Sequence, residues 1–218
     1  ADRRAMGWLD WMAAPSVPTL SGRNIQLRLP RARDFDQWRE LRHASRGFLT
    51  PWEPSWTPNE LSREAFRQRL RRYRQDASER TSYTFFVFDL RGEQLYGGLT
   101  LGRIQRGVAQ SATLGYWMGE RYAGRGIMAN AVLTVTDFAF EIEGLHRIEA
   151  ACLPSNARSI GLLEKCGFRR EGHLRNYLKI AGVWEDHLLY SLLADDPITS
   201  VIASRSITRE SHPARTRL

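Results

Sequence analysis

Residues 111–126 read SATLGYWMGERYAGRG, and the organisation of the chain follows from this stretch. Its first half, SATLGYWM (111–118), is typical of a β-strand. The apolar residues after it recur at helical spacing, as Ile127, Ala131, Val135, Phe138 and Ile142. Between them, RYAGRG (121–126) combines glycine, which lets backbone approach a bound group, with arginine, which matches phosphate or carboxylate. The stretch therefore predicts a strand-to-helix turn that holds an anion.

A helix that begins after RYAGRG would present free N–H groups at this turn. Four such groups and a partial charge of about +0.5 gather at a helix N-terminus, so a pyrophosphate could lie on them. The alternative is a glycine-rich turn with no ligand. The stretch contains neither the GxxxxGK[ST] of a phosphate-binding loop nor the G-x-G-x-x-G of a dinucleotide site.

Composition predicts one domain with loose ends. The chain has 218 residues, of which 42% are hydrophobic, enough to bury one core. Its formal net charge of +8 suggests an anionic partner. That signal is weak, because the basic residues are scattered among acidic ones rather than gathered in one block.

Several classes of protein are not supported. Cys152 and Cys166 have no CxxC spacing and are expected to be buried thiols in a reducing compartment. The five histidines are dispersed, so no metal site is predicted. GWLDWMAA (7–14) is short and interrupted by Asp10, and no segment approaches the ~18 apolar residues of a membrane span. We expect a soluble, cytoplasmic protein with no membrane partner.

The N-terminal half predicts a strand and two helices. Residues 25–29 alternate, and a helix is expected from Asp34 to about Arg46. TPNE (57–60) matches a capping box that would open the second helix. The inner face of this helix would carry Leu61, Ala65, Phe66, Leu70 and Tyr73. Its other side is rich in arginine, which fits a solvated face or, as the alternative, an RNA-binding stripe.

The remaining elements are predicted by the same patterns. A hairpin is expected from TFFVFDL (84–90) and LYGGLTLGRI (95–104). After RYAGRG and its helix, RIEAACL (147–153) is expected to form a strand. A helix over 155–167 and strands over 168–180 and 183–193 complete the pattern. We predict a lead-in segment over 1–22, a domain over 23–194 and a polar tail over 195–218.

The composite order of strand, RxxGxG, helix, strand, N-x-x-S and helix resembles the GCN5-related N-acetyltransferases. The Rim-type ribosomal-protein-alanine N-acetyltransferases are the closer match, from about residue 22 to 194. The motifs that carry it are FLTPWEP (48–54), GRGIMANA (124–131), NARSIGLLEKCGFRREG (156–172) and WEDHLLYSLL (184–193). The chain departs from the family at Asn130, where a carboxylate is frequent, so a contact through that side chain is not carried over.

The resemblance implies an α/β fold with a mixed, mostly antiparallel twisted sheet and flanking helices. Strands 111–118 and 147–153 are predicted to be parallel, because a helix crosses over between them, and the family fold splays them apart. The resemblance makes acetyl-CoA the cosubstrate, with its pantetheine arm between these strands and its pyrophosphate on the loop. The implied binding residues are Trp117, Met118, Arg121, Gly124, Arg125, Gly126, Ile127 and Asn156.

The resemblance also proposes catalytic and substrate-binding residues. Ser159 corresponds to a proton donor for the leaving thiolate, although Asn156 and Ser159 also suit ordinary helix capping. Glu53, in PWEP, is the candidate base, and its alternative is a surface carboxylate in a turn. Tyr177 and Asp186 match substrate-side positions, with a half-buried aromatic and a strand-pairing hydrogen bond as their alternatives.

The leading hypothesis is an acetyl-CoA-dependent N-acetyltransferase that acts on the α-amine of a protein N-terminus. The resemblance suggests a ribosomal protein that begins with Ala or a similarly small residue, and therefore possible ribosome association. An α-amine with a pKa of about 7.7–8.0 is far easier to deprotonate than a lysine at about 10.4, which suits a sequence without an obvious strong base. The alternatives are an aminoglycoside or polyamine acetyltransferase, or a ribosome- or RNA-associated protein without turnover.

Overall fold

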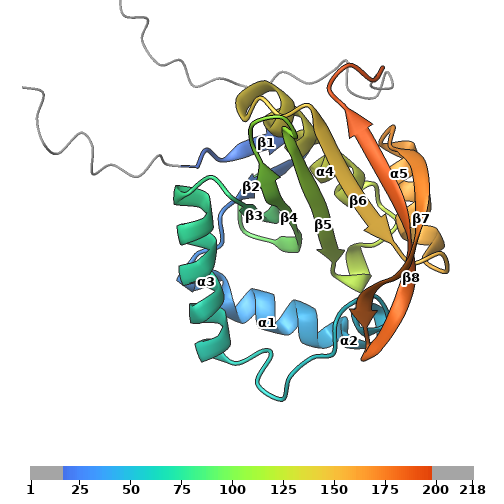
Figure 1. Cartoon of the computed structure of the whole chain (residues 1–218). Coiled ribbons are helices and arrows are strands. Elements are labelled where there is room, and N and C mark those ends of the chain that lie inside the picture. The colour runs from blue at the N-terminus through green and yellow to red at the C-terminus, as the bar shows by residue number, and fades with distance from the viewer. Residues whose placement is uncertain (1–16, 198–218) are drawn as a thin grey trace, which may run out of the picture.

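The strand predicted over 111–118 lies within an eight-stranded sheet of order β1-β2-β3-β4-β5-β6-β8-β7 (Figure 1). The computed structural model describes residues 17–197; residues 1–16 and 198–218 lie outside it. The strands are β1 Leu20–Gly22, β2 Ile25–Arg28, β3 Tyr83–Asp89, β4 Leu95–Gln105, β5 Ser111–Met118, β6 Arg147–Cys152, β7 Arg169–Ile180 and β8 Val183–Leu193. All neighbours pair antiparallel except β5 and β6, which are parallel. The predicted mixed sheet is confirmed.

Helices cover both faces of this sheet. They are α1 Phe35–Ala44, α2 Arg46–Leu49, α3 Arg63–Ser78, α4 Ile127–Asp137 and α5 Ala157–Lys165. Shorter turns are η1 Ala32–Asp34, η2 Thr50–Trp52, η3 Glu120–Tyr122 and the π-helical η4 Phe138–Ile142. Alternation along β3 divides the core, because Phe85 and Val87 join a cluster with α4 while Phe86 and Phe88 pack with α1 and α3.

β5 and β6 separate after a short paired segment. Their register ends at Thr113↔Glu149, whereas β5 continues along β4 as far as Met118↔Gly97. β6 likewise remains paired with β8 as far as Cys152↔Leu188. The backbone of β5 beyond Thr113 therefore has no partner on β6, as the splayed pair of strands requires.

The second predicted helix begins later than expected, so the capping box at TPNE (57–60) was wrong. Ser62 is the N-cap of α3, because its hydroxyl accepts a 3.1 Å hydrogen bond from the N–H of Ala65. Residues 57–60 instead form a turn, closed by the Glu60 N–H and the Thr57 carbonyl at 3.0 Å. The Glu60 side chain forms an ion pair with Arg69, which places it across α3 rather than at the start of a helix.

Other boundaries differ slightly from the sequence prediction. The sheet begins at Leu20, inside the expected lead-in segment. The helical pattern after Asp137 ends in the π-helical η4, where Ile142 is 50% exposed. Most of the lead-in and of the tail falls outside the described residues, so those two divisions stay predictions. None of the helices between residues 17 and 197 combines the length and the apolar composition that a membrane span requires.

Candidate active site

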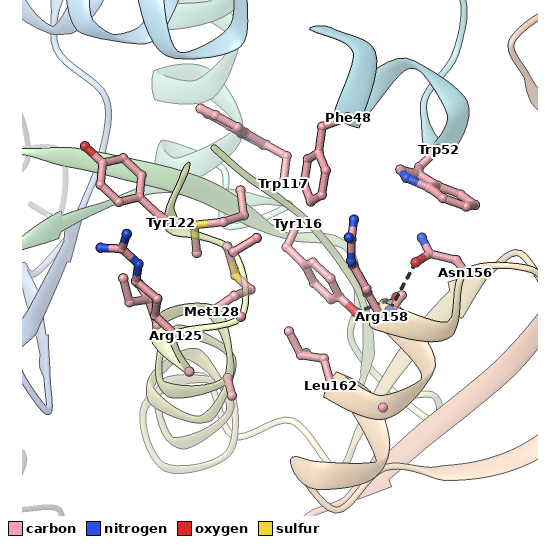
Figure 2. Close-up of a pocket in the computed structure, with 18 of the residues that line it drawn as sticks. Phe48, Trp52, Tyr116, Trp117, Tyr122, Arg125, Met128, Asn156, Arg158 and Leu162 are labelled. Carbon is pink, nitrogen blue, oxygen red and sulfur yellow. Dashed lines mark hydrogen bonds between the residues drawn. The ribbon is translucent and has the colours of Figure 1, made fainter. Parts of the chain in front are cut away.

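A cavity of about 410 Å³ opens where β5 leaves β6 (Figure 2). Phe48 and Trp52 line the cavity from the α2–η2 segment, and Arg158 and Leu162 line it from α5. The lining residues are Phe48, Leu49, Trp52, Glu53, Tyr116, Trp117, Met118, Tyr122, Ala123, Gly124, Arg125, Gly126, Ile127, Met128, Ala129, Asn156, Arg158, Ser159, Gly161, Leu162 and Lys165. The cavity thus joins RYAGRG, the splayed strand and the N-x-x-S helix.

The glycine loop presents bare backbone to this cavity. Gly124 and Gly126 have φ of +77° and +75°, which other residues rarely adopt, and a Cβ built on either would meet no atom within 4 Å. Gly126 is the N-cap of α4 and supplies no capping side chain, so the first amides of that helix are left for another acceptor. This open cradle fits a diphosphate group.

Charge in the cavity also suits an anion. Its charged lining residues are the cations Arg125, Arg158 and Lys165 and one carboxylate, Glu53. Arg121 is on the same loop, but it is not a lining residue, and its guanidinium lies 4.9 Å from the centre of the Tyr122 ring. The structure therefore brings Arg125, and not Arg121, to the cavity.

The part of β5 that is unpaired with β6 offers a hydrogen-bond donor. The Gly119 N–H bonds to the Tyr96 carbonyl at 2.9 Å, which fixes the direction of backbone groups at this end of the strand. Since these directions alternate along a strand, the N–H of Met118 points away from β4, toward the gap left by β6. Of the two predicted residues, Met118 thus has the better-placed amide, and Trp117 turns its amide to β4.

Asn156 and Ser159 occupy the N-terminus of α5. The Asn156 Oδ1 accepts a 3.1 Å hydrogen bond from the Ser159 N–H, so Asn156 is the helix cap, as its alternative reading proposed. Both residues nevertheless line the cavity. Capping and ligand contact are compatible here, because the cap uses only the carbonyl oxygen of the Asn156 amide.

Tyr116 is a functional candidate that the sequence prediction missed. Its hydroxyl shares a 2.7 Å hydrogen bond with the Ser159 Oγ. Burial raises the pKa of Tyr116 well above its usual value, and the bond to Ser159 offsets this only in part. The phenol therefore stays protonated and can donate. Its position two residues before Met118 on the same face of the strand was the available signal.

The Glu53 side chain is fixed by hydrogen bonds, unlike a surface carboxylate in an exposed turn. Its carboxylate accepts hydrogen bonds from Arg42 at 2.6 and 3.2 Å and from the Trp56 indole at 2.8 Å. Its side chain is 21% exposed. A carboxylate has about four lone-pair sites, so about one remains for another donor.

Arg42 is the second residue that sequence reasoning missed. Its guanidinium lies 4.7 and 5.0 Å from the centres of the Trp56 and Trp117 rings. Its Nε is buried without a hydrogen-bond partner, which is unfavourable for stability. We infer that Arg42 serves to fix the position of the Glu53 carboxylate.

A second cavity of about 450 Å³ lies between α1, α3 and the sheet. It shares two lining residues with the first cavity, Glu53 and Trp117. Gly98 makes room for this arrangement, since a Cβ there would lie 2.7 Å from the Trp117 Nε1. Glu53, the candidate base, and Trp117 therefore line both cavities.

Two other expected positions lie away from both cavities. Tyr177, 36% exposed, and Asp186 line neither of them. Asp186 instead accepts hydrogen bonds from the Asn176 N–H at 2.8 Å and pairs with His173 at 2.9 Å. Asn130 bonds to the backbone of Arg23 in the β1–β2 turn, so it has a structural contact. Within residues 17–197, no group of three or more potential metal ligands is found.

Comparisons with known proteins agree with this geometry. The family model described as "Acetyltransferase (GNAT) domain" matches residues 24–169. The chain is 35% identical to the probable N-acetyltransferase YjcK of Bacillus subtilis, over 81% of this chain and 98% of the relative. It is 30% identical to the [ribosomal protein uS5]-alanine N-acetyltransferase of Escherichia coli, over 83% and 94%.

A solved structure of a related protein is also similar to this chain. Mycobacterium smegmatis RimJ in complex with CoA-disulfide superposes with a TM-score of 0.75 and 33% sequence identity. The match covers 84% of this chain and 88% of that protein.

Proposed function

Because the chain belongs to the acetyltransferase (GNAT) family and is an N-acetyltransferase, we propose that it acetylates the α-amine of a protein N-terminus. The proposed acceptor is a ribosomal protein that begins with Ala or a similarly small residue, encountered in the cytoplasm. Acetyl-CoA supplies the acetyl group as a thioester.

The observation that carries this proposal is that Glu53 and Trp117 line both cavities. The first has the cationic, amide-lined end that suits CoA phosphates, and it reaches the Tyr116–Ser159 hydroxyl pair. The second leaves a separate route for an acceptor. Acyl transfer needs both partners to reach one point from different sides.

Each residue at that point has a chemical role. The remaining lone-pair site of Glu53 can accept the proton of the attacking amine. The Met118 N–H can donate to the oxyanion that develops on the thioester carbonyl. Tyr116 and Ser159 can donate a proton to the leaving sulfur, and the N-terminus of α5 favours negative charge there. We propose Gly124, Arg125, Gly126 and Ile127 as the phosphate cradle, with Asn156 on the pantetheine arm.

The choice of an α-amine rests on the modest base. At pH 7, neutralising an amine with a pKa of about 7.7–8.0 costs roughly 1 kcal/mol, whereas a lysine at about 10.4 would cost about 4.6 kcal/mol. Glu53 is already committed to Arg42 and Trp56, which favours the easier amine. The relative named as a [ribosomal protein uS5]-alanine N-acetyltransferase supports the same class of acceptor.

The test is turnover of peptides that begin with Ala, Ser or Thr, beside N-blocked lysine peptides, spermidine and an aminoglycoside. We expect acetyl transfer to the free α-amines, with the Ala peptide among the good substrates. Turnover confined to the small molecules or to the lysine side chain would replace the proposed acceptor and leave the acetyl-CoA cavity unaffected.

A further inference from the structure

All four charged residues that line the second cavity are already paired with one another. Arg42 and Glu53 form one ion pair at 2.6 Å, and Arg69 and Glu60 form the other. The Arg69 and Glu60 side chains are 29% and 18% exposed, so both are largely withdrawn from water. The lining therefore carries two positive and two negative charges, each already in an ion pair, and the acceptor site that remains on Glu53 is the one proposed for the attacking amine.

The remaining walls are aromatic and hydroxylic. Trp38, Trp56, Tyr73 and Phe86 supply rings, and Thr84 and Thr100 lie on the sheet. The two threonine hydroxyls share a 3.0 Å hydrogen bond, which uses one hydroxyl hydrogen and leaves the other for a ligand. Such a lining suits short apolar or hydroxyl side chains together with peptide groups.

The second cavity also has a way out for a longer chain. Pro54 and Ser55 line it and are exposed, so it opens along the loop that follows Glu53. That loop is tied to the β7–β8 turn, where the Ala181 N–H donates to the Glu53 carbonyl at 3.0 Å. A polypeptide whose first residue lies at Glu53 can therefore continue through the cavity to solvent.

We propose that the second cavity holds the residues that follow the acceptor amine and selects peptides with uncharged side chains at their second and third positions. This inference rests on the proposed function. Its volume of about 450 Å³ is that of a small ligand site, enough for a few small residues. A lysine or glutamate side chain there would lose water and find its natural partners already engaged.

The same reasoning disfavours polyamines as acceptors. A polyamine carries several ammonium groups, and each one that leaves water needs a carboxylate partner. Glu53 and Glu60 are the two carboxylates of this lining, and each is neutralised by an arginine. Selection thus comes from charge balance rather than from cavity size.

The experiment uses three peptides that differ only at the second residue, which is Ala, Lys or Glu after an N-terminal Ala. Arg69→Gln frees Glu60 and should raise kcat/KM for the Lys peptide by about 2- to 5-fold, the range of a partly exposed ion pair. Glu60→Gln frees Arg69 and should raise kcat/KM for the Glu peptide by a similar factor. Arg71→Gln, an exposed change on the same helix, is the matched control and should alter neither.

A third variant tests occupancy of the cavity without changing its charge. Thr100→Phe fills the floor and should raise KM for the Ala peptide by about 10- to 200-fold, the range for a group excluded from its pocket. The affinity for acetyl-CoA should not change in any variant, which also shows that each one is folded.

The inference fails while the proposed function stands if the wild type turns over the three peptides equally, or if Arg69→Gln and Glu60→Gln both match Arg71→Gln. An unchanged KM in a folded Thr100→Phe would also overturn it. Binding of acetyl-CoA without turnover of any peptide would instead refute the proposed function, and this inference with it.

Discussion

The hydrogen bond between Tyr116 and Ser159 makes a specific kinetic prediction about proton transfer to the leaving thiolate. The two hydroxyls are 2.7 Å apart and both residues line the first cavity. A proton given to sulfur by either hydroxyl can be replaced from the other. We therefore expect Ser159→Ala and Tyr116→Phe to damage the same step.

The size of the effect follows from the leaving group. General acid catalysis contributes about 10²- to 10⁴-fold, but a thiol with a pKa of about 8.5 leaves as a thiolate with modest assistance. Each single variant should thus lower kcat by about 10- to 1,000-fold, toward the lower part of that range. Loss of one hydrogen bond should lower the free energy of unfolding by only about 0.5–1.5 kcal/mol.

The assay is steady-state release of CoA thiol, with acetyl-CoA affinity measured separately by calorimetry. Tyr190→Phe is the matched control, because the Tyr190 hydroxyl is bonded to Glu164 of α5 at 3.2 Å but does not line the cavity. We expect that control to keep nearly full kcat. Because burial raises the pKa of Tyr116, its ionisation should not depress kcat on the alkaline side within the usual assay range.

The decisive comparison is the double variant. If the hydroxyls act as a unit, Ser159→Ala combined with Tyr116→Phe should be no slower than the worse single variant. Multiplicative losses would show that they act independently. A kcat for Tyr116→Phe equal to that of Tyr190→Phe would refute the role of Tyr116, and an unchanged kcat in Ser159→Ala would leave Ser159 as a structural residue of α5.

Three further predictions follow from other contacts. Gly126→Val should abolish acetyl-CoA binding. Gly107→Val is the control, because Gly107 has a similar φ of +69° and equally open surroundings, and it should keep binding. Equal affinities of the two variants in calorimetry would exclude the phosphate cradle. Glu53→Gln should lower kcat/KM more at pH 7 than at pH 9, where an α-amine with a pKa of about 7.7–8.0 is already neutral; a pH-independent loss would argue against a base. Glu143→Gln should lower the unfolding free energy at pH 7 by about 1.5–3 kcal/mol, the range for hydrogen bonds to a charged group, because Arg106, Tyr83 and Arg80 lose a buried anionic partner. Burial raises the pKa of Glu143, but its hydrogen bonds to those three residues outweigh burial and lower the pKa below its ordinary value. The difference in unfolding free energy between the wild type and Glu143→Gln, measured in urea, should therefore hold above about pH 4.5 and fade as the pH drops through the folded pKa. A difference that stays constant with pH would contradict this.

The sequence by itself determined the local elements and the anion-binding loop. Period-two and helical patterns are read within a few residues, so β3, β4, β5 and α4 were predictable from them. Gly124 and Gly126 were recognisable because left-handed backbone at a helix start requires glycine. Asn156 and Ser159 were also recognisable in the sequence as residues at the start of α5. The separation of β5 from β6 was predicted from the family resemblance.

Tertiary structure alone decided which side chains meet. Tyr116 and Ser159 are 43 positions apart, and their contact depends on how α5 packs across the splayed strands. Arg42 reaches Glu53 only because α1 and the following loop fold over Trp117, and Glu60 pairs with Arg69 instead of capping a helix. Sequence periodicity assigns a residue to a face, but the partner on that face is chosen by long-range packing, which also forms the second cavity.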